Sequence, residues 1–171
     1  LATEHGLTPG DIAAVTCHVP EVVEVSLVYD DPQTPQQSQF SMPFAVACML
    51  VNGAIAPHHL SGAVLNDPAL RALMAKVSMV RDDALAANPA APEGARVVIE
   101  TKDGRTVSGI LEEPTGMPGN PLSDEQINAK FLACCAYAGL DAYLGEGLLE
   151  TLWAVEERAS LTGQFLATAT S

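Results

Sequence analysis

The side chains that most often carry acid/base or metal chemistry are few in this chain, and they are spread out. His58 and His59 form the one adjacent histidine pair. Neighbouring residues point in different directions on a helix or a strand, and no third ligand follows at a regular spacing, so such a pair seldom binds one metal ion. We expect a solvated loop here. His18 lies on the polar side of a predicted strand, where a surface or interface role competes with a catalytic one.

Two pairs of adjacent carboxylates, Asp82-Asp83 and Glu112-Glu113, are the other candidates for acid/base chemistry. On a strand, adjacent side chains face opposite sides and cannot act together on one substrate. We expect surface charges. The sequence has no glycine-rich phosphate loop, no GxSxG motif and no zinc signature. It therefore predicts no catalytic residue, no metal and no cofactor within this chain.

Composition limits the possible partners. The chain has 171 residues, 48% of them hydrophobic and 17% charged, which is typical of a globular domain. Its net charge of −13 would repel nucleic acid and anionic membranes, so we exclude both as partners. No apolar run approaches the roughly 20 residues of a membrane span, and no signal-like stretch begins the chain. We expect a cytoplasmic protein.

The four cysteines, Cys17, Cys48, Cys134 and Cys135, have no CxxC spacing. Cys134 and Cys135 are neighbours on or beside the apolar face of a predicted helix. Free buried thiols are therefore expected rather than disulfides or metal ligands.

A helix is predicted after Ser123. Ser123 and Gln126 form a capping box, so the helix starts at about Asp124. Gly139 offers a left-handed stop. Apolar side chains recur between these ends at a helical spacing and predict one continuous apolar face, made of Ile127, Phe131, Cys134, Cys135 and Ala138.

Two more helices and a strand are predicted upstream. Alternation over residues 12–19 is typical of a half-buried strand. Ser41 is expected to cap a helix that has Pro43 at its second position and ends at Gly53. Asp67-Pro68 opens another helix. Residues 29–39, rich in Asp, Pro and Gln, are expected to form a long loop, which is the first place to look for ligand contacts.

Asp103-Gly104 predicts a hairpin, because this dipeptide accepts the positive φ values of a type I′ turn. A two-residue loop would put Val97 opposite Ile110 and Ile99 opposite Ser108. Together these elements predict an α+β fold, with a small antiparallel sheet packed on helices in two layers and followed by C-terminal helices. We expect an α+β domain over residues 1–122 and a helical segment over residues 123–171.

Three blocks of this sequence resemble the MmgE/PrpD family, the relatives of 2-methylcitrate dehydratase. The first is Gly116-x-Pro118-x-Asn120-Pro121-Leu122-Ser123 followed by Lys130-Phe131, and the second runs from Pro35 to Gly53. The Asp103-Gly104 hairpin lies between them in the family's order. The resemblance spans about Leu7 to Leu161 but covers the C-terminal part of a full-length relative only.

The resemblance implies a cofactor-independent lyase or isomerase that acts on small polycarboxylates such as 2-methylcitrate, cis-aconitate or iminodisuccinate. In the family, a lysine and a histidine of a KxYPxCxxxH-like stretch would fall just before Leu1, and other acid/base residues lie further upstream in a helical domain. The resemblance therefore implies that this chain is a fragment, the lid domain with the C-terminal helices of its neighbour. It would be inactive alone and would meet a polycarboxylate only when an upstream helical domain completes it.

The resemblance also suggests residues at the edge of the substrate pocket: Gln39, Ser41, Phe44, Gly116, Asn120 and Lys130. Relatives often have Tyr at the position of Phe44, and Phe44 cannot donate a proton or a hydrogen bond as Tyr would. For Lys130, a solvated or ion-paired helix lysine is the competing interpretation.

Two alternatives stay open. The chain could be a free-standing interaction module without catalysis, and we expect a homodimer because Leu144, Leu148, Leu152 and Trp153 would otherwise be exposed. A third hypothesis is a small autonomous enzyme that uses His58 or His59.

Overall fold

The computed structural model describes residues 1–87 and 93–157 of the chain. These residues fall into two compact units, one running from Leu1 to Pro121 and one beginning at Leu122. Each unit has its own secondary structure and its own packing.

The first unit is built on a four-stranded sheet with the strand order β2-β1-β3-β4. β1 pairs with β3, and β3 with β4, in the antiparallel sense, whereas β1 and β2 run parallel. The strands are β1 (Ile12–Val19), β2 (Val77–Arg81), β3 (Ala95–Thr101) and β4 (Thr106–Leu111).

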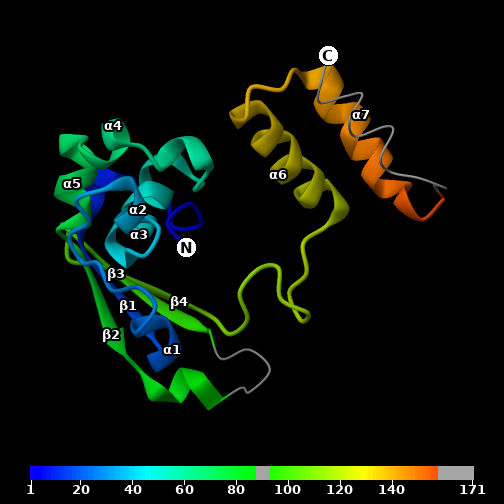
Figure 1. The fold of residues 1–171 in the computed structure, drawn as a ribbon. Coiled ribbons are helices and arrows are strands. Elements are labelled where there is room, and N and C mark those ends of the chain that lie inside the picture. Colours follow the sequence, from blue (N-terminus) through cyan, green and yellow to red (C-terminus); the bar gives the residue numbers. More distant parts are fainter. Residues whose placement is uncertain (88–92, 158–171) are drawn as a thin grey trace. The chain divides into compact units, whose positions relative to one another are not determined.

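The α+β class is confirmed, but the prediction of an antiparallel sheet is wrong for the β1–β2 pair. Between these strands the chain passes through helices α3 (Met42–Asn52) and α5 (Pro68–Met74), which pack together on one face of the sheet (Figure 1). A crossover through helices on one face returns the chain in the direction in which it left. The sheet is therefore mixed.

The other helical elements of the first unit are short. They are α1 (Glu21–Glu24), α2 (Pro35–Ser38), α4 (Gly62–Leu65) and the 3₁₀ turns Pro9–Asp11, Pro57–His59 and Asp83–Ala87. The predicted long loop over residues 29–39 thus contains one turn of helix, α2. Arg71 holds this segment, since its guanidinium donates to Asp31 Oδ1 at 2.6 Å and to the carbonyl of Pro32 at 2.8 Å.

The predicted caps of the two longer helices are confirmed. Ser41 Oγ accepts a hydrogen bond from the backbone N–H of Phe44 at 3.2 Å, and Gly53 ends α3 with a φ of 72°. Asp67 Oδ1 accepts from the backbone N–H groups of Ala69 and Leu70 at 2.8 and 2.9 Å. These bonds satisfy N–H groups that have no partner within the helix.

The core lies between the sheet and α3 and α5. α3 contributes Phe44, Ala47 and Cys48 to it, all fully buried. The inward side chains of β1 meet them, as alternation along that strand predicts. The largest fully buried apolar side chains are Phe44, Ile12, Leu65, Val15 and Val19.

The β3–β4 hairpin forms where Asp103-Gly104 predicts it, but the predicted register is wrong by one residue. Val97 lies opposite Gly109 and Ile99 opposite Val107. The loop has three residues instead of two, because Thr101 N–H bonds to the carbonyl of Arg105 at 2.9 Å. Gly104, with a φ of 86°, supplies the left-handed residue of that loop.

The second unit is a helical hairpin of α6 (Asp124–Tyr137) and α7 (Ala142–Trp153), followed by a 3₁₀ turn at Val155–Glu157. The capping box is confirmed: Ser123 N–H donates to Gln126 Oε1 at 2.8 Å, and Gln126 N–H donates to Ser123 Oγ at 3.3 Å. The helical tail expected after residue 157 lies outside the described residues.

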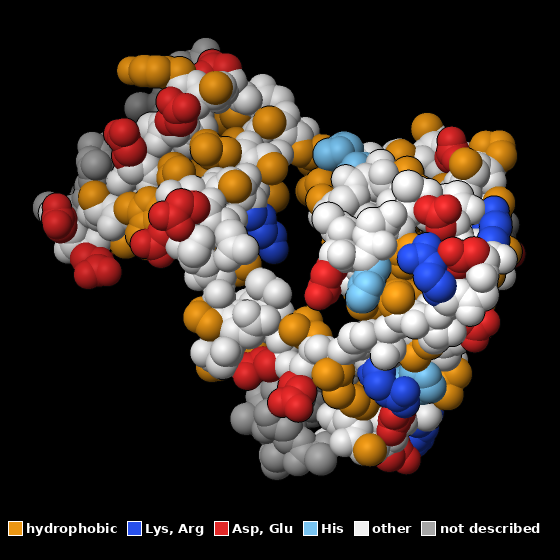
Figure 2. All heavy atoms as spheres, turned by 180° about the vertical axis from the view of Figure 1, so that it is seen from behind, with side chains coloured by type: hydrophobic (Ala, Val, Ile, Leu, Met, Phe, Trp, Pro, Cys, Tyr) orange, Lys and Arg blue, Asp and Glu red, His pale blue; other side chains and the backbone are white. Residues whose placement is uncertain are grey.

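The predicted apolar face of α6 is covered only in part. Cys135 is buried against Gly145 of α7, but Cys134 is exposed, which corrects the expectation of a buried thiol there. A single neighbouring helix covers one stripe of α6 and leaves the adjacent stripe open. On the face of this hairpin shown in Figure 2, hydrophobic side chains are exposed among acidic ones.

No helix in the described part of the chain is both long enough and apolar enough to cross a membrane.

We predict that Phe44→Ala lowers the free energy of unfolding by about 3–5 kcal/mol, because it leaves a cavity where the ring is 1% exposed. Phe40→Ala is the matched control: that ring is 52% exposed, so the loss should be only about 0.5 kcal/mol. Urea unfolding followed by circular dichroism measures both. Equal losses would contradict the core position of Phe44.

We also predict that one of the four thiols reacts quickly with a disulfide reagent at pH 8. Cys134 is exposed, whereas burial raises the pKa of Cys17 from 9.0 to about 11. The thiolate is the reactive form, so the buried thiols should react only after unfolding. Since the folded pKa of Cys17 is raised, its contribution to stability is present below pH 9 and is lost toward pH 11. Fast labelling that persists in Cys134→Ser would contradict this assignment.

Candidate functional site

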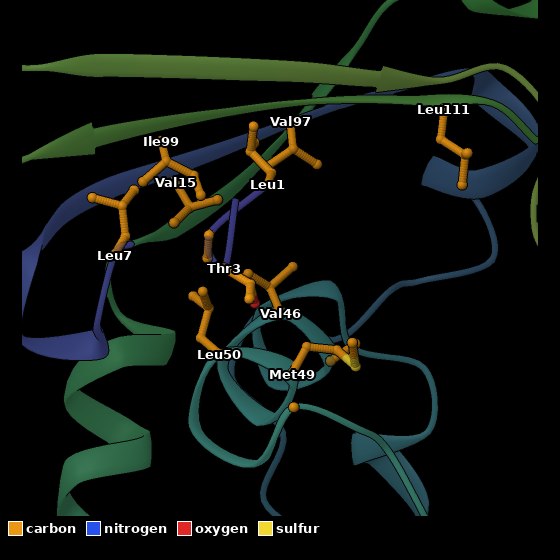
Figure 3. A pocket seen from close by; sticks show the side chains of 13 residues that line it. Leu1, Thr3, Leu7, Val15, Val46, Met49, Leu50, Val97, Ile99 and Leu111 are labelled. Carbon is orange, nitrogen blue, oxygen red and sulfur yellow. The ribbon is translucent and has the colours of Figure 1, made fainter. Parts of the chain in front are cut away.

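The first unit has a groove between α3 and the sheet, with a volume of about 620 Å³. From the sheet side it receives side chains of β1, β3 and β4, and from the other side those of α3 (Figure 3). The segment before β1 closes one part of it. The labelled lining residues are Leu1, Thr3, Leu7, Val15, Val46, Met49, Leu50, Val97, Ile99 and Leu111.

The chemistry of this groove is apolar. Thr3 is the one polar side chain among the residues that line it, and none of those side chains is titratable near neutral pH. Such a surface can cover or bind hydrocarbon, but it has no group to hold a carboxylate or to move a proton. The groove is therefore a candidate docking surface rather than a catalytic centre.

α3 explains why the groove exists. Its sequence, MPFAVACMLVN, is apolar on almost every side. One stripe, with Phe44, faces the core, and another stripe, with Val46, Met49 and Leu50, lines the groove. Helices that are apolar all round are normally buried all round. The apolar residues on every side of α3 could have indicated this groove from the sequence. The site predicted from the sequence did not include it.

Three predicted pocket-edge residues lie around the start of α3. Gln39 is exposed at the C-cap of α2, so its amide is free for solvent or a ligand. Ser41 is buried, and its hydroxyl accepts the bond that caps α3. Phe44 is in the core. Of the three, only Gln39 presents a polar group at the surface.

Two further predicted residues, Gly116 and Asn120, lie in a loop held together by its own hydrogen bonds. Asn120 Nδ2 donates to the carbonyl of Glu113 at 3.0 Å and to Thr115 Oγ1 at 3.4 Å. Gly116 N–H donates to the carbonyl of Asn120 at 2.7 Å, and Gly119 N–H donates to Glu113 Oε1 at 2.6 Å. Gly116 has a φ of 100°, which L side chains rarely adopt. Both motif residues therefore shape this loop.

Lys130 is exposed on α6, in the second unit. It makes no ion pair with any residue in the described ranges. Within the first unit, no hydrogen bond or ion pair of the described residues joins the Gln39–Phe44 region to the loop with Asn120. The structure thus locates five of the six predicted residues in two segments of the first unit, and Lys130 on a helix of the second unit.

The histidines have local partners. His59 Nδ1 accepts a hydrogen bond from the backbone N–H of Ala56 at 3.0 Å, and burial, followed by the neighbouring His58, lowers the pKa of His59. His18 pairs in the sheet with Val80 and Arg96, on the outer face. Within the ranges that the structure describes, no group of three His, Cys, Asp or Glu side chains is arranged to hold a metal ion.

A charged cluster that sequence reasoning did not bring together lies where β1 and β2 end. The guanidinium of Arg81 contacts Glu21 at 2.8 Å and Asp83 at 2.7 Å, and Arg96 contacts Asp82 at 3.0 Å. The hydrogen bond from Arg96 lowers the pKa of Asp82. Figure 2 shows Lys and Arg side chains (blue) next to Asp and Glu side chains (red) on this face of the first unit. These exposed pairs contribute little stability, but they neutralise the cations that an anionic ligand would need.

We predict that Asn120→Asp destabilises the first unit by about 1 kcal/mol, since a carboxylate cannot donate the two hydrogen bonds made by Nδ2. It would also place a negative charge beside Glu113. Gln36→Glu is a matched amide-to-acid control at an exposed position and should leave the urea midpoint nearly unchanged. Equal shifts in the two midpoints would show that Asn120 does not hold the loop.

Comparison with models of protein families finds a match. The model of the MmgE/PrpD C-terminal domain matches residues 1–142. A search of curated proteins finds none that matches the chain.

Proposed function

Since the chain belongs to the MmgE/PrpD family, of which it carries the C-terminal domain, we propose that it is the lid portion of a cofactor-independent lyase or isomerase. Its substrate is a small polycarboxylate of the type of 2-methylcitrate, cis-aconitate or iminodisuccinate. The observation that carries this proposal is the family match over residues 1–142.

The proposed chemistry begins with proton abstraction next to a carboxylate. It needs a positioned base, and it needs cations or hydrogen-bond donors to hold the acid groups and the enolate-like transition state. A substrate with two or three negative charges makes the cationic requirement the more demanding one.

The described cations of the first unit are largely engaged elsewhere. Arg71, Arg81, Arg96 and Arg105 each make an ion pair with a carboxylate. Lys76 Nζ donates to the carbonyl of Ile12 at 2.7 Å. These contacts support the proposal that an upstream helical domain supplies the base and the cationic groups. The chain alone would then be inactive.

In this proposal the lid contributes the edge of the pocket. Gln39 is the residue best placed to donate a hydrogen bond to a substrate carboxylate, because its amide is exposed. Gly116 and Asn120 fix the shape of a second edge. Ser41 and Phe44 position the start of α3, and Phe44 donates no proton. Lys130 would add a positive charge from the helical segment.

A second candidate function is an interaction module that forms a homodimer. It is favoured by exposed apolar surface: the side chain of Tyr143 is 84% exposed, Trp153 is also exposed, and the groove beside α3 is open. Surfaces of this kind are typical of protein interfaces. They equally suit contact with an upstream domain, so activity measurements separate the two functions.

The test is turnover of 2-methylcitrate, cis-aconitate and iminodisuccinate by the purified chain, alone and mixed with the upstream helical half of a family member. We expect no turnover alone and turnover of one substrate in the mixture. Activity of the chain alone would refute the lid proposal. No activity in either case, together with a dimeric chain, would favour the interaction module.

In an active mixture, Gln39→Ala should lower kcat/KM about tenfold, as expected for loss of one hydrogen bond to a charged group. Gln36→Ala, one turn away on an exposed position, should not. Equal effects would remove Gln39 from the pocket edge.

A further inference from the structure

The first residues of the chain have the hydrogen bonds of a helix C-terminus. His5 N–H donates to the carbonyl of Leu1 at 3.1 Å, which is one α-helical turn. Gly6 follows with a φ of 61°. Gly6 N–H then donates to the carbonyl of Thr3, and Leu7 N–H to that of Ala2, at 3.2 and 2.9 Å. This pair of bonds around a left-handed glycine is the Schellman motif, which ends α-helices.

This helical turn lies on the groove. Leu1, Ala2 and Thr3 line it, and the side chain of Leu1 lies 3.5 Å from where a Cβ on Gly109 would be. A second hollow of about 450 Å³, lined by Leu1, Val97 and Leu111 among others, adjoins the same turn. Among the described residues, Leu1 of this one turn of helix supplies the nearest side-chain atoms to Gly109 of β4.

The opposite wall of the groove also lacks a cover. Met49 is 48% exposed although it sits on a helix that is apolar all round. Such a helix is expected to have neighbours on both sides. The core provides one neighbour of α3, and the groove side has room for another.

We infer that the groove beside α3 is the docking site of an amphipathic α-helix that runs into Leu1 and has Leu1–His5 as its last turn. Its apolar residues would occupy the positions three, four, seven and eight residues before Leu1, since these share the face of Leu1 on a helix. That face would cover Met49 and Leu50 on one side and Val97 and Leu111 on the other.

The helix end distinguishes this occupant from two others. The volume of the groove also suits a small apolar ligand, and an exposed apolar surface suits a second copy of the chain. Neither would explain why residues 1–7 form a complete helix stop at the mouth of the groove. The inference rests on the proposed function in one respect, because the docked helix is how an upstream half would join the lid.

The experiment adds a designed 14-residue helix directly before Leu1 in the full chain. In the in-phase version, leucines occupy the four positions named above, and in the out-of-phase version the same residues are rotated to the opposite face. We expect the in-phase helix to raise Tm by about 5 °C or more, because it buries four leucine side chains in the groove, and the out-of-phase helix to change Tm little.

Two variants of α3 make the test specific to the groove. Met49→Lys places a charge in the groove, and Val51→Lys places one at an equally exposed position that does not line it, since the two side chains are 48% and 49% exposed. Met49→Lys should abolish the gain in Tm from the in-phase helix, and Val51→Lys should preserve it.

Equal Tm gains from the two helices, or a gain that survives Met49→Lys, would overturn the inference. So would an unextended chain that is a dimer and becomes a monomer through Met49→Lys alone, because the occupant would then be a second copy. All readouts are Tm or mass in solution. Failure of the docking inference is therefore distinct from failure of the proposed function, which is judged by turnover.

Discussion

The burial of α3 is the constraint on which the first unit depends. The helix has one face packed against the sheet and α5, and its rings and methyl groups supply the centre of the core. To reach that place, the chain must leave β1, cross the sheet face and return at β2, and the return is what makes the β1–β2 pair parallel. The caps at Ser41 and Gly53 then fix where α3 begins and ends.

The same helix has more apolar surface than the core covers. A helix that is apolar on all sides satisfies the core with one stripe and presents the other to the groove, where Met49 remains half exposed. The α6–α7 hairpin repeats this situation, since α7 covers the Cys135 side of α6 and not the side of Cys134. Each unit thus has more apolar surface than it buries by itself. Contiguous exposed apolar surface of this kind is typical of interaction sites.

Local signals predicted local structure well. The caps at Ser41, Asp67 and Ser123 were identified from residue type and spacing, because capping is chemistry between residues two or three positions apart. The β3–β4 register was predicted wrongly, because Asp-Gly fits both a two-residue and a three-residue loop. Pairing within the sheet determines which loop forms. The parallel pair and the exposure of Cys134 depend on contacts distant in sequence, and no local pattern carries them.

The residues of the predicted site also differ in how far local sequence explains them. The residues that make the sequence resemble its family turn out to shape the backbone: Ser41 caps α3, Gly116 takes a left-handed turn, and Asn120 holds its loop. These backbone roles require particular residue types whatever the substrate is. The family-like motifs therefore indicate the fold rather than the substrate. Under the proposed function, the choice of substrate would then depend on side chains that the backbone does not need. Gln39 is an example among the described residues, because its side chain is exposed and makes no capping hydrogen bond. Members of one family can in this way keep the fold of this domain while exposed side chains on it change.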